Sequence, residues 1–328
     1  MTAAPPLPPE AAVARLEIAN GPVRASLMTL GAAVTELRME GVAHSLVLGS
    51  PDLAAYRDAM RYFGAVVGPV ANRIAGARAP LGGRVLDLAA NEGPNALHGG
   101  PRGTSTRLWR LADRDAASAR FDLTWPDGED GLPGPLHLSA TYAIEADGAL
   151  RIELEGEGEA PTLCNPAFHG YWVLDGSGTL HDHRLAVAAE RYLPVDAAGI
   201  PTGDPAPVAG TPFDFRSPRA IGPDSAVDHN FCLDGAGYRE VARLETDALA
   251  LAVETDAPGL QIYDAARIDT APFAGHEGRP YGAHGGLAIE PQLWPDAPNR
   301  PGYPPVALVP GERFRQTSRF RLTAKETA

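Results

Sequence analysis

Apolar and polar residues alternate along several short stretches of this chain, a pattern typical of β-strands with one buried face. In the clearest stretch, apolar residues fill every second position from Leu136 to Ile144, Asp147-Gly148 supplies a turn, and the alternation resumes from Leu150 to Leu154. This pattern predicts a β-hairpin. The alternating positions of residues 249–253, followed by a Pro258-Gly259 turn and the stretch LQIYDA, predict a second hairpin with a longer connection.

Near the C-terminus an acid follows directly on an apolar stretch. Residues 286–289, Gly-Leu-Ala-Ile, have the composition of a strand, and Glu290 is followed by a proline-rich segment that cannot continue a sheet ladder. We therefore expect the strand to end before Glu290, so that the carboxylate can face a pocket.

Glycine and proline leave little room for helices. The 36 glycines and 32 prolines are spread throughout the 328 residues, so turns recur at short intervals. The best helix candidate is short, residues 50–60, with Ser50 as N-cap and Pro51 at the first helical position. No change of composition, repeat or linker marks a domain boundary. Many short strands and few helices predict an all-β fold, a large sandwich.

The charge balance argues against nucleic acid as a partner. The chain has 41 acidic and 28 basic residues, a formal net charge of -13 and a pI near 5.1, so no basic surface is expected for a phosphate backbone. With 44% hydrophobic residues and a mean hydropathy of -0.15, the composition is that of an ordinary globular protein. A neutral or cationic small molecule is the more suitable partner.

The sequence predicts neither export nor membrane insertion. The N-terminal segment lacks a basic start followed by an apolar run, and nothing later approaches about 18 uninterrupted apolar residues. Cys164 and Cys232 form no CxxC motif, and we expect small buried thiols in a reducing compartment. These features predict a cytoplasmic protein.

Polar residues able to do chemistry occur in five short stretches. Each of them alone fits an ordinary structural role, such as a surface ion pair, a turn residue, a core histidine or a cap. The stretches are GPVANRIAG with Asn72 and Arg73, NEGPNALHGG with His98, NPAFHGYWVLDG with His169, VDHNFCLDG with Asp228, and GGLAIEPQ with Glu290.

Taken together and in this order, the stretches resemble the successive motifs of the aldose 1-epimerase, or galactose mutarotase, family. The resemblance extends to YLPVDAAGIPTG leading to GTPFDFRSP, to TWPDGEDGLPGPL, EPQLWPDAPNRP and the closing LVPGERFRQTSRFRL, and so spans roughly residues 15 to 322. It implies a large antiparallel β-sandwich of the galactose mutarotase-like type with few short helices. The expected organisation is a disordered segment at 1–14, one domain at 15–322 and a C-terminal tail at 323–328.

The resemblance also implies roles for individual residues. The family's proton donor matches His169, in the motif HGYW, and its proton acceptor matches Glu290, before PDAPN. A monosaccharide aldose is the implied partner, with no cofactor and no metal. The implied sugar-binding residues are Asn72, Arg73, His98, Asp228 and Gln261.

One acid and one base suffice to interconvert the α and β anomers of a sugar. Removing a proton from the C1 hydroxyl and delivering one to the ring oxygen opens the C1–O5 bond to an aldehyde, and rotation about C1–C2 presents the other carbonyl face. At neutral pH a carboxyl with an ordinary pKa of about 4.3 is ionised, and an imidazole near ~6.5 is available as imidazolium, the more so where carboxylates raise its pKa. Trp172 is a candidate apolar wall beneath the sugar.

Four positions depart from the family's pattern. Pro69 stands where many members have Arg, Val173 where Asn is usual, and Pro291 where Thr is usual, while Asp264 lies in YDA where the family has YTG. We expect these changes, including a charge of Asp264 near the pocket, to affect the choice of sugar more than the reaction. The oligomeric state is left open.

Two other functions could use the same scaffold. A non-catalytic carbohydrate-binding protein would keep the sugar-binding residues but would not need both His169 and Glu290. A glycoside hydrolase needs two carboxylates roughly 5 to 10 Å apart, for which Glu290 with Asp228 or Asp296 could serve, but it leaves His169 without a role. The HDH stretch, His181–His183, lacks a nearby third ligand for a metal, and we expect a solvated loop there.

Overall fold

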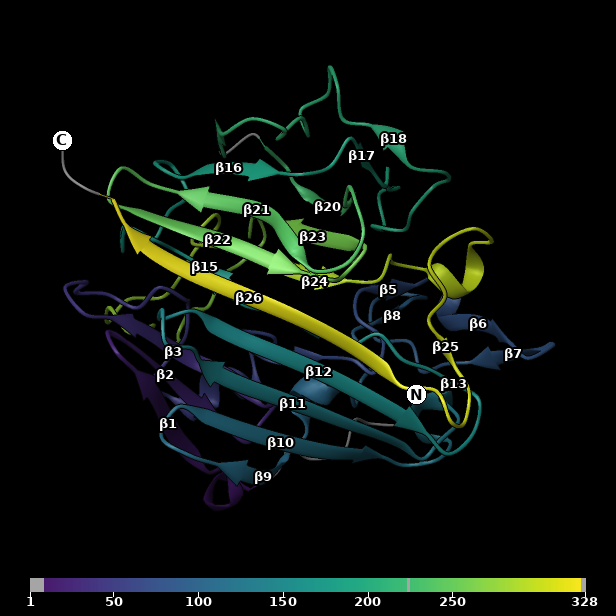
Figure 1. The fold of residues 1–328 in the computed structure, drawn as a ribbon. Coiled ribbons are helices and arrows are strands. Elements are labelled where there is room, and N and C mark those ends of the chain that lie inside the picture. The colour runs from purple at the N-terminus through teal and green to yellow at the C-terminus, as the bar shows by residue number, and fades with distance from the viewer. Residues whose placement is uncertain (1–8, 223–224, 326–328) are drawn as a thin grey trace.

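Two large antiparallel sheets pack face to face in the computed structural model, which describes residues 9–222 and 225–325 (Figure 1). The rings of Trp172, from the smaller sheet, and Phe320, from the larger one, stack with centres 4.8 Å apart, and both are fully buried. Burial of such large aromatic side chains supplies much of the stabilisation of a sandwich core. The all-β sandwich predicted from the sequence is confirmed.

The larger sheet contains the first predicted hairpin. Its strands β11 and β12 pair from Leu136 with Gly158 to Ile144 with Leu150, which confirms that prediction. In spatial order the sheet consists of β19 (Arg219–Ala220), β16 (Arg184–Val187), β21 (Arg239–Glu245), β22 (Leu249–Thr255), β26 (Phe314–Ala324), β12 (Leu150–Gly158), β11 (Leu136–Ile144), β10 (Ser118–Trp125) and β9 (Arg110–Arg114).

The second predicted hairpin is wrong, because the chain changes sheets at its turn. Strand β22 already has β21 and β26 as neighbours, so no edge is free for the next strand, and β23 joins the smaller sheet. That sheet consists, in spatial order, of β15 (Tyr171–Trp172), β24 (Leu287–Gln292), β23 (Gly259–Tyr263), β20 (Asp228–Cys232), β17 (Arg191–Tyr192) and β18 (Ala206–Pro207).

Shorter elements complete the described part of the chain, and no helix in it is long and apolar enough to cross a membrane. A three-stranded sheet is formed by β1 (Arg15–Asn20), β2 (Val23–Met28) and β3 (Ala33–Met39). Strand pairs are β4 (Val66–Val67) with β14 (Ala167–Phe168), β5 (Arg73–Ile74) with β8 (Ala96–Leu97), β6 (Arg78–Leu81) with β7 (Arg84–Asp87), and β13 (Thr162–Leu163) with β25 (Ala307–Leu308). The 3₁₀ helices are η1 (Glu10–Ala12), η2 (Leu53–Arg57), η3 (Ala75–Ala77), η4 (Thr104–Thr106), η5 (Glu129–Gly131) and η6 (Ala297–Asn299).

The predicted helix at residues 50–60 is present only as the 3₁₀ helix η2, and its cap differs from the prediction. Asp52 is the N-cap, and its carboxylate accepts a hydrogen bond from the backbone N–H of Ala54 at 2.9 Å. The hydroxyl of Ser50 instead donates to the carbonyl of Ala274 at 2.6 Å. Because Oγ of Ser50 also accepts a hydrogen bond from the N–H of Asp52 at 3.1 Å, Ser50 ties the turn before η2 to a distant loop.

Strand β24 continues through Glu290 and Pro291, so the expectation that it ends before Glu290 is wrong. The backbone N–H of Ile289 points toward β15, where it meets the carbonyl of Gly170 at 3.4 Å. Pro291 lies two residues after Ile289, so its nitrogen also points away from β23. The strand on that side, β15, pairs only with Leu287 and Ala288 and does not reach Pro291. Its missing N–H costs no ladder bond with β23, and Glu290 is held inside a sheet.

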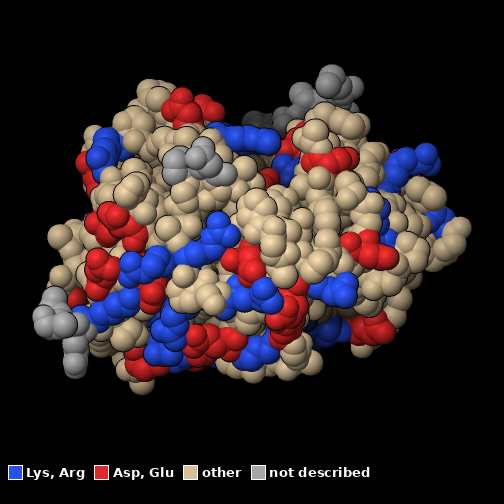
Figure 2. Space-filling model, turned by 90° about the horizontal axis from the view of Figure 1, so that it is seen from above, with Lys and Arg blue, Asp and Glu red and all other residues tan. Residues whose placement is uncertain are grey.

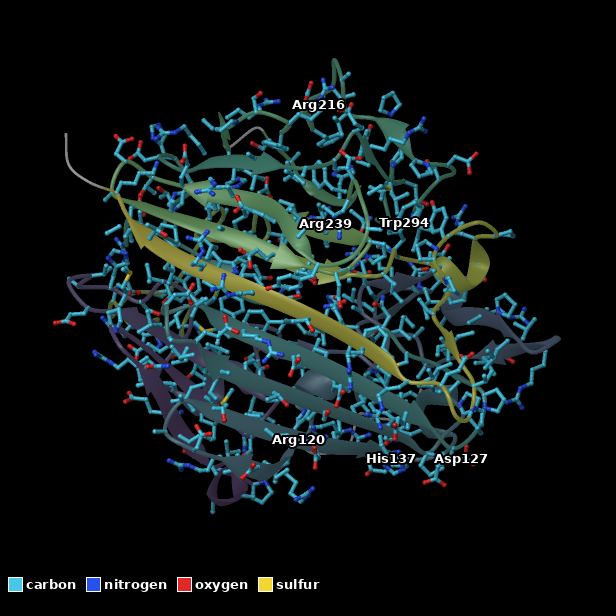
Figure 3. The ribbon with its side chains drawn as sticks, in the orientation of Figure 1. Arg120, Asp127, His137, Arg216, Arg239 and Trp294 are labelled. Atoms are coloured by element: carbon cyan, nitrogen blue, oxygen red, sulfur yellow. The ribbon has the colours of Figure 1, made fainter. Side chains whose placement is uncertain are left out.

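Paired charges cover the outer face of the nine-stranded sheet. Arg120, on β10, contacts both Asp122 and Glu155, and His137, on β11, contacts Glu159. Figure 3 labels Arg120 and His137 on this sheet. Basic and acidic side chains are likewise intermixed over the surface seen in Figure 2. Exposed pairs of this kind contribute little to stability individually.

The sequence predictions for the two cysteines are confirmed, whereas the prediction for the HDH stretch is only partly correct. Cys164 and Cys232 are both free and buried, as predicted, and burial raises the pKa of each thiol. His181 and Asp182 are exposed, but His183 is fully buried and its Nε2 accepts a hydrogen bond from the N–H of Leu174 at 2.8 Å. The expectation of a solvated loop is therefore wrong for His183.

Candidate active site

A cavity of about 270 Å³ lies on the face of the six-stranded sheet that points away from the nine-stranded sheet. It brings together the seven residues for which the family resemblance implied a catalytic or sugar-binding role, from six separate stretches of the chain. These residues are Asn72, Arg73, His98, His169, Asp228, Gln261 and Glu290.

Strand register explains why four of the lining residues share one face. Gln261 on β23 lies opposite Glu290 on β24, and Asp228 on β20 lies opposite Tyr263 on β23. Directly opposite residues, and residues two apart on one strand, project from the same side of a sheet. The sheet therefore presents a carboxylate, an amide, a second carboxylate and a phenol together.

The same alternation corrects the role expected for Trp172. Tyr171 and Trp172 are adjacent on β15 and so project to opposite faces, with Tyr171 lining the cavity and Trp172 buried in the core against Phe320. Trp172 is fully buried and does not line the cavity. The aromatic wall is made by Tyr171 with Tyr62 and Tyr263.

The proposed acid and base contact each other directly. Nε2 of His169 lies 3.4 Å from Oε1 of Glu290, and both side chains are almost completely buried. Burial, reinforced by the charge of Asp228, raises the pKa of Glu290 well above its usual value, although Arg73 lowers it. Burial lowers the pKa of His169 to about 4. The imidazolium expected from an ordinary pKa of ~6.5 is therefore not the favoured form of this side chain, because burial removes the charged ring from water.

Asn72, just before β5, and His98, just after β8, are joined by reciprocal hydrogen bonds. The N–H of Asn72 donates to Nδ1 of His98 at 3.1 Å, and the N–H of His98 donates to the carbonyl of Asn72 at 3.0 Å. Because Nδ1 of His98 accepts, the neutral ring carries its proton on Nε2, where it can donate to a ligand. Burial, with the nearby His169 and Arg73, holds the pKa of His98 well below its usual value.

The glycine after His98 allows this turn to form. Gly99 has φ +84°, and a Cβ there would lie 1.9 Å from the carbonyl oxygen of Gly68. Any side chain at Gly99 would therefore force either the turn that follows His98 or the backbone of Gly68 to shift.

Arg73 lies between two acids. Its Nε and Nη2 donate to the carboxylate of Glu92 at 2.6 and 2.8 Å, and its Nη1 lies 3.7 Å from Oδ2 of Asp228. Burial lowers the pKa of the guanidinium, but the Glu92 hydrogen bonds and the charge of Asp228 outweigh burial and raise the pKa above its usual value. Arg73 is thus a fixed cation at the cavity wall.

Several polar atoms of the cavity have no hydrogen-bond partner among the described residues. Gln261 donates its Nε2 hydrogen to Asp228 at 2.6 Å, but its Oε1 is unpaired. Nδ1 of His169 and Oε2 of Glu290 are also buried and unpaired. Since buried polar groups are normally satisfied, this concentration of unpaired donors and acceptors indicates a binding site for a polar ligand.

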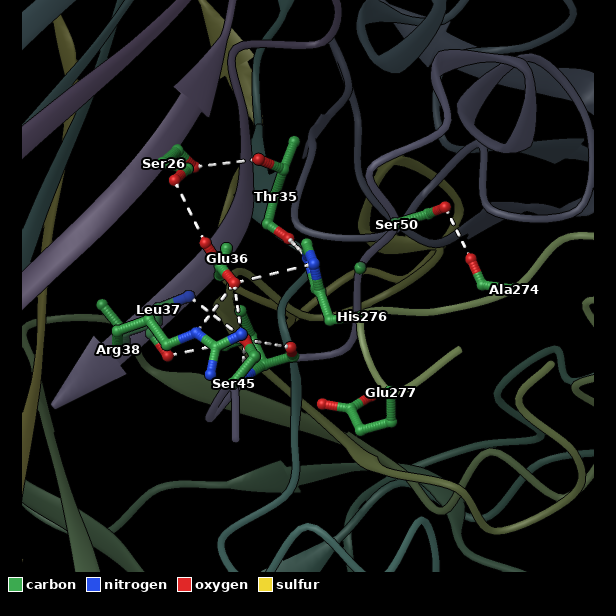
Figure 4. A network of polar contacts seen from close by, with 12 residues as sticks. Ser26, Thr35, Glu36, Leu37, Arg38, Ser45, Ser50, Ala274, His276 and Glu277 are labelled. Carbon is green, nitrogen blue, oxygen red and sulfur yellow. Dashed lines mark hydrogen bonds and ion pairs between the residues drawn. The ribbon is translucent and has the colours of Figure 1, made fainter. Parts of the chain in front are cut away.

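A long loop, residues 264–286, forms the mouth of the cavity with Arg267, Ile268 and Asp269. Its far side is fastened to the three-stranded sheet, where Nε2 of His276 contacts the carbonyl of Thr35 at 2.8 Å (Figure 4). The Ser50 hydroxyl holds the same loop through Ala274. The mouth is therefore anchored to the protein at a distance from the cavity.

None of the four departures from the family's pattern, Pro69, Val173, Asp264 and Pro291, lines the cavity. Asp264 is buried, and its carboxylate accepts hydrogen bonds from the N–H groups of Val227 and Ala266, both at 3.1 Å. The charge expected near the pocket therefore lies outside the cavity lining and fixes the backbone before Asp228. Asp296 is likewise buried outside the cavity lining, with Ala75 and Arg300 as partners.

Sequence reasoning missed Glu92, Tyr62 and Tyr263 as lining residues. Tyr263 could have been found from the strand period, because it lies two residues after Gln261. Glu92 lies six residues before His98, in the same motif, but nothing in its spacing indicates that it contacts Arg73. Tyr62 carries no signal in the sequence.

Comparisons with known proteins agree on one family. Residues 14–321 match the family model described as aldose 1-epimerase. Galactose mutarotase of Homo sapiens is 37% identical over 95% of this chain and 94% of its own, and aldose 1-epimerase of Escherichia coli is 33% identical over 93% and 94%. The solved structure of an aldose epimerase homologue from C. elegans has a TM-score of 0.91 at 30% identity, covering 96% of this chain and all of its own.

Proposed function

Because the chain belongs to the aldose 1-epimerase family, it is an isomerase that interconverts the α and β anomers of a free aldose, and we propose that Glu290 and His169 carry the two proton transfers. The observation that carries this assignment is the 3.4 Å contact between the two side chains in a polar cavity. Acid–base catalysis by two positioned groups needs no cofactor, and each transfer can contribute on the order of 10²–10⁴ in rate.

Ring opening moves one proton onto the base and one off the acid. Ionised Glu290 takes the C1 hydroxyl proton while protonated His169 gives its proton to the ring oxygen, and the C1–O5 bond breaks to leave an aldehyde. Glu290 is then protonated and His169 neutral. After rotation about C1–C2 the same groups close the ring with exchanged roles.

Glu290 and His169 share one transferable proton, which lies on His169 before ring opening and on Glu290 after it. With Glu290 protonated and His169 neutral, neither side chain carries a buried charge, and the pKa shifts of both groups favour this state. It is the arrangement from which an open-chain sugar closes. A cyclic sugar reacts once the proton has moved from Glu290 to His169, a transfer that their contact permits.

The remaining lining residues would bind the sugar hydroxyls. Arg73 and the Nε2 hydrogen of His98 are donors, Asp228 and the Oε1 of Gln261 are acceptors, and Asn72 holds His98 in the required tautomer. An uncharged monosaccharide such as glucose or galactose is the proposed substrate. The two buried, free thiols support a cytoplasmic location.

Polarimetry of freshly dissolved α-D-glucose and α-D-galactose tests the proposal. The protein should speed relaxation to the anomeric equilibrium, and Glu290→Gln should lose most of that rate while keeping the wild-type melting temperature. A wild-type protein that leaves the spontaneous rate unchanged across a panel of aldoses would refute catalysis and favour sugar binding alone. Phenol release from an aryl glycoside would instead indicate a hydrolase.

A further inference from the structure

The guanidinium of Arg73 is enclosed on three sides. Glu92 binds one edge in a bidentate manner through Nε and Nη2, and Asp228 lies 3.7 Å from Nη1 at the other edge. The backbone of Gly199 lies against the group so closely that a Cβ there would be 2.9 Å from Nη1. The side chain is 11% exposed, so it has little freedom to move.

Glu92 is itself fixed by a tight turn. Its N–H donates to the carbonyl of Asn95 at 3.2 Å, and its carbonyl accepts from the N–H of Asn95 at 3.0 Å. The side chain of Asn91 bonds both the N–H and the carbonyl of Leu97, at 2.7 and 2.9 Å. The turn that carries Glu92 is thus tied to the residue that precedes His98.

The contact with Glu92 occupies only some of the N–H donors of Arg73. A guanidinium has five N–H donors in a rigid plane, and Glu92 uses the Nε–H and one hydrogen of Nη2. Of the remaining nitrogens, Nη1 faces Asp228, with Oδ2 3.7 Å away. Without Glu92, Asp228 would be the nearest carboxylate able to attract the guanidinium.

We propose that Glu92 is a positioning residue that holds Arg73 away from Asp228 and so keeps both groups available for the sugar hydroxyls. It acts through Arg73 and does not contact the reacting atoms. The inference rests on the proposed sugar-binding role of Arg73 and Asp228.

Loss of Glu92 should therefore weaken sugar binding more than catalysis. Arg73 would close onto Asp228, and each would satisfy the other instead of a hydroxyl. Because a charged hydrogen-bonding partner is lost from a bidentate contact, we expect KM to rise about 10- to 100-fold. The turnover number kcat should stay within about 3-fold, since His169 and Glu290 are untouched.

The experiment compares Glu92→Ala, Glu92→Gln and Glu92→Asp by mutarotation kinetics, with sugar affinity measured separately by calorimetry. Glu92→Gln keeps one acceptor and should give an intermediate KM, and Glu92→Asp should also rank between wild type and Glu92→Ala. The control is Glu157→Gln, which removes an exposed acid paired with Arg313 on the nine-stranded sheet and should change neither constant. Melting temperatures verify folding, and Glu92→Gln serves if Glu92→Ala does not fold.

The outcomes separate this inference from the proposed function. An inactive wild-type protein would overturn the proposed function itself. An active wild-type protein with unchanged KM and affinity in both Glu92→Ala and Glu92→Gln would overturn the positioning role of Glu92 alone, as would a fall in kcat without a change in KM. A raised KM with retained kcat in the Glu92 variants supports it.

Discussion

Nε2 of His169 and Oε1 of Glu290 lie 3.4 Å apart, and with at most 5% of either side chain exposed the two groups titrate as a pair. Burial separates their pKa values in opposite directions, which keeps one proton on the pair across a wide pH range. This is the protonation state that anomer interconversion requires, because one group must accept a proton while the other donates.

The rate should therefore have a bell-shaped pH dependence in which activity on the acid side is lost only at unusually low pH. Activity is lost when the pair gains a second proton, near the His169 pKa of about 4, or loses its only proton, above the raised pKa of Glu290. The measurement is kcat/KM for glucose from about pH 3.5 to 9, with the spontaneous rate subtracted. An acidic limb near 6.5, typical of an exposed histidine, would contradict this assignment.

Removing the charge of Asp228 should change the pH at which activity is lost on the alkaline side of the pH–rate profile. Asp228 raises the pKa of Glu290, so Asp228→Asn should lower that pKa and shift the loss of activity to lower pH. KM should rise as well, because one of the two acceptor oxygens of the carboxylate is replaced by an N–H donor. The control is Asp269→Asn at the cavity mouth, which should leave that pH unchanged; equal shifts in both variants would show a nonspecific effect of charge.

The buried imidazole should also affect stability. Its folded pKa of about 4 lies below the unfolded value of ~6.5, so the unfolded state binds a proton first and stability is lost as the pH falls from about 6.5 toward 4. This contribution is present above pH 6.5 and is lost progressively toward pH 4. The free energy of unfolding from urea titrations, compared between wild type and His169→Gln at pH 7.5 and 4, isolates it. An equal decrease in both proteins would argue against it.

Features of the fold and the site that involve neighbouring residues in the sequence could be predicted, whereas contacts between distant segments could not. The hairpin of β11 and β12 followed from alternation around Asp147-Gly148, because both strands and their turn are adjacent in the sequence. The partner of β23 did not follow from the sequence, because it depends on which sheet edges remain free. Similarly, the resemblance to a family identified seven residues that now line one cavity, but the contact between Arg73 and Glu92 depends on how two loops meet.

The aromatic residues of the site yield a prediction that separates core from cavity. Trp172→Phe should destabilise the protein by roughly 1–3 kcal/mol through loss of packing against Phe320 while leaving KM unchanged. Tyr62→Ala should instead raise KM several-fold, because its ring lines the cavity 4.9 Å from that of His98. Chemical denaturation and mutarotation kinetics test the two variants together. An increase in KM for Trp172→Phe would restore that residue as a sugar contact.

Gly199 provides the sharpest test of how tightly Arg73 is held. With φ +75°, alanine at this position is strained by roughly 1–2 kcal/mol, and its Cβ would lie 2.9 Å from Nη1 of a side chain that Glu92 prevents from moving aside. Gly199→Ala should therefore raise KM about 10-fold in mutarotation assays. Gly210→Ala is the matched control, because Gly210 has the same φ of +75° but no atom within 4 Å of the added Cβ.

If backbone strain alone mattered, the Gly199→Ala and Gly210→Ala variants would lose similar stability and keep the wild-type KM. If Arg73 is held as the contacts indicate, only Gly199→Ala alters KM. Adding Glu92→Gln to Gly199→Ala should then raise KM by less than the product of the two single effects, because both changes displace the same guanidinium. Independent, multiplicative effects on KM would mean that Gly199 and Glu92 do not act through Arg73.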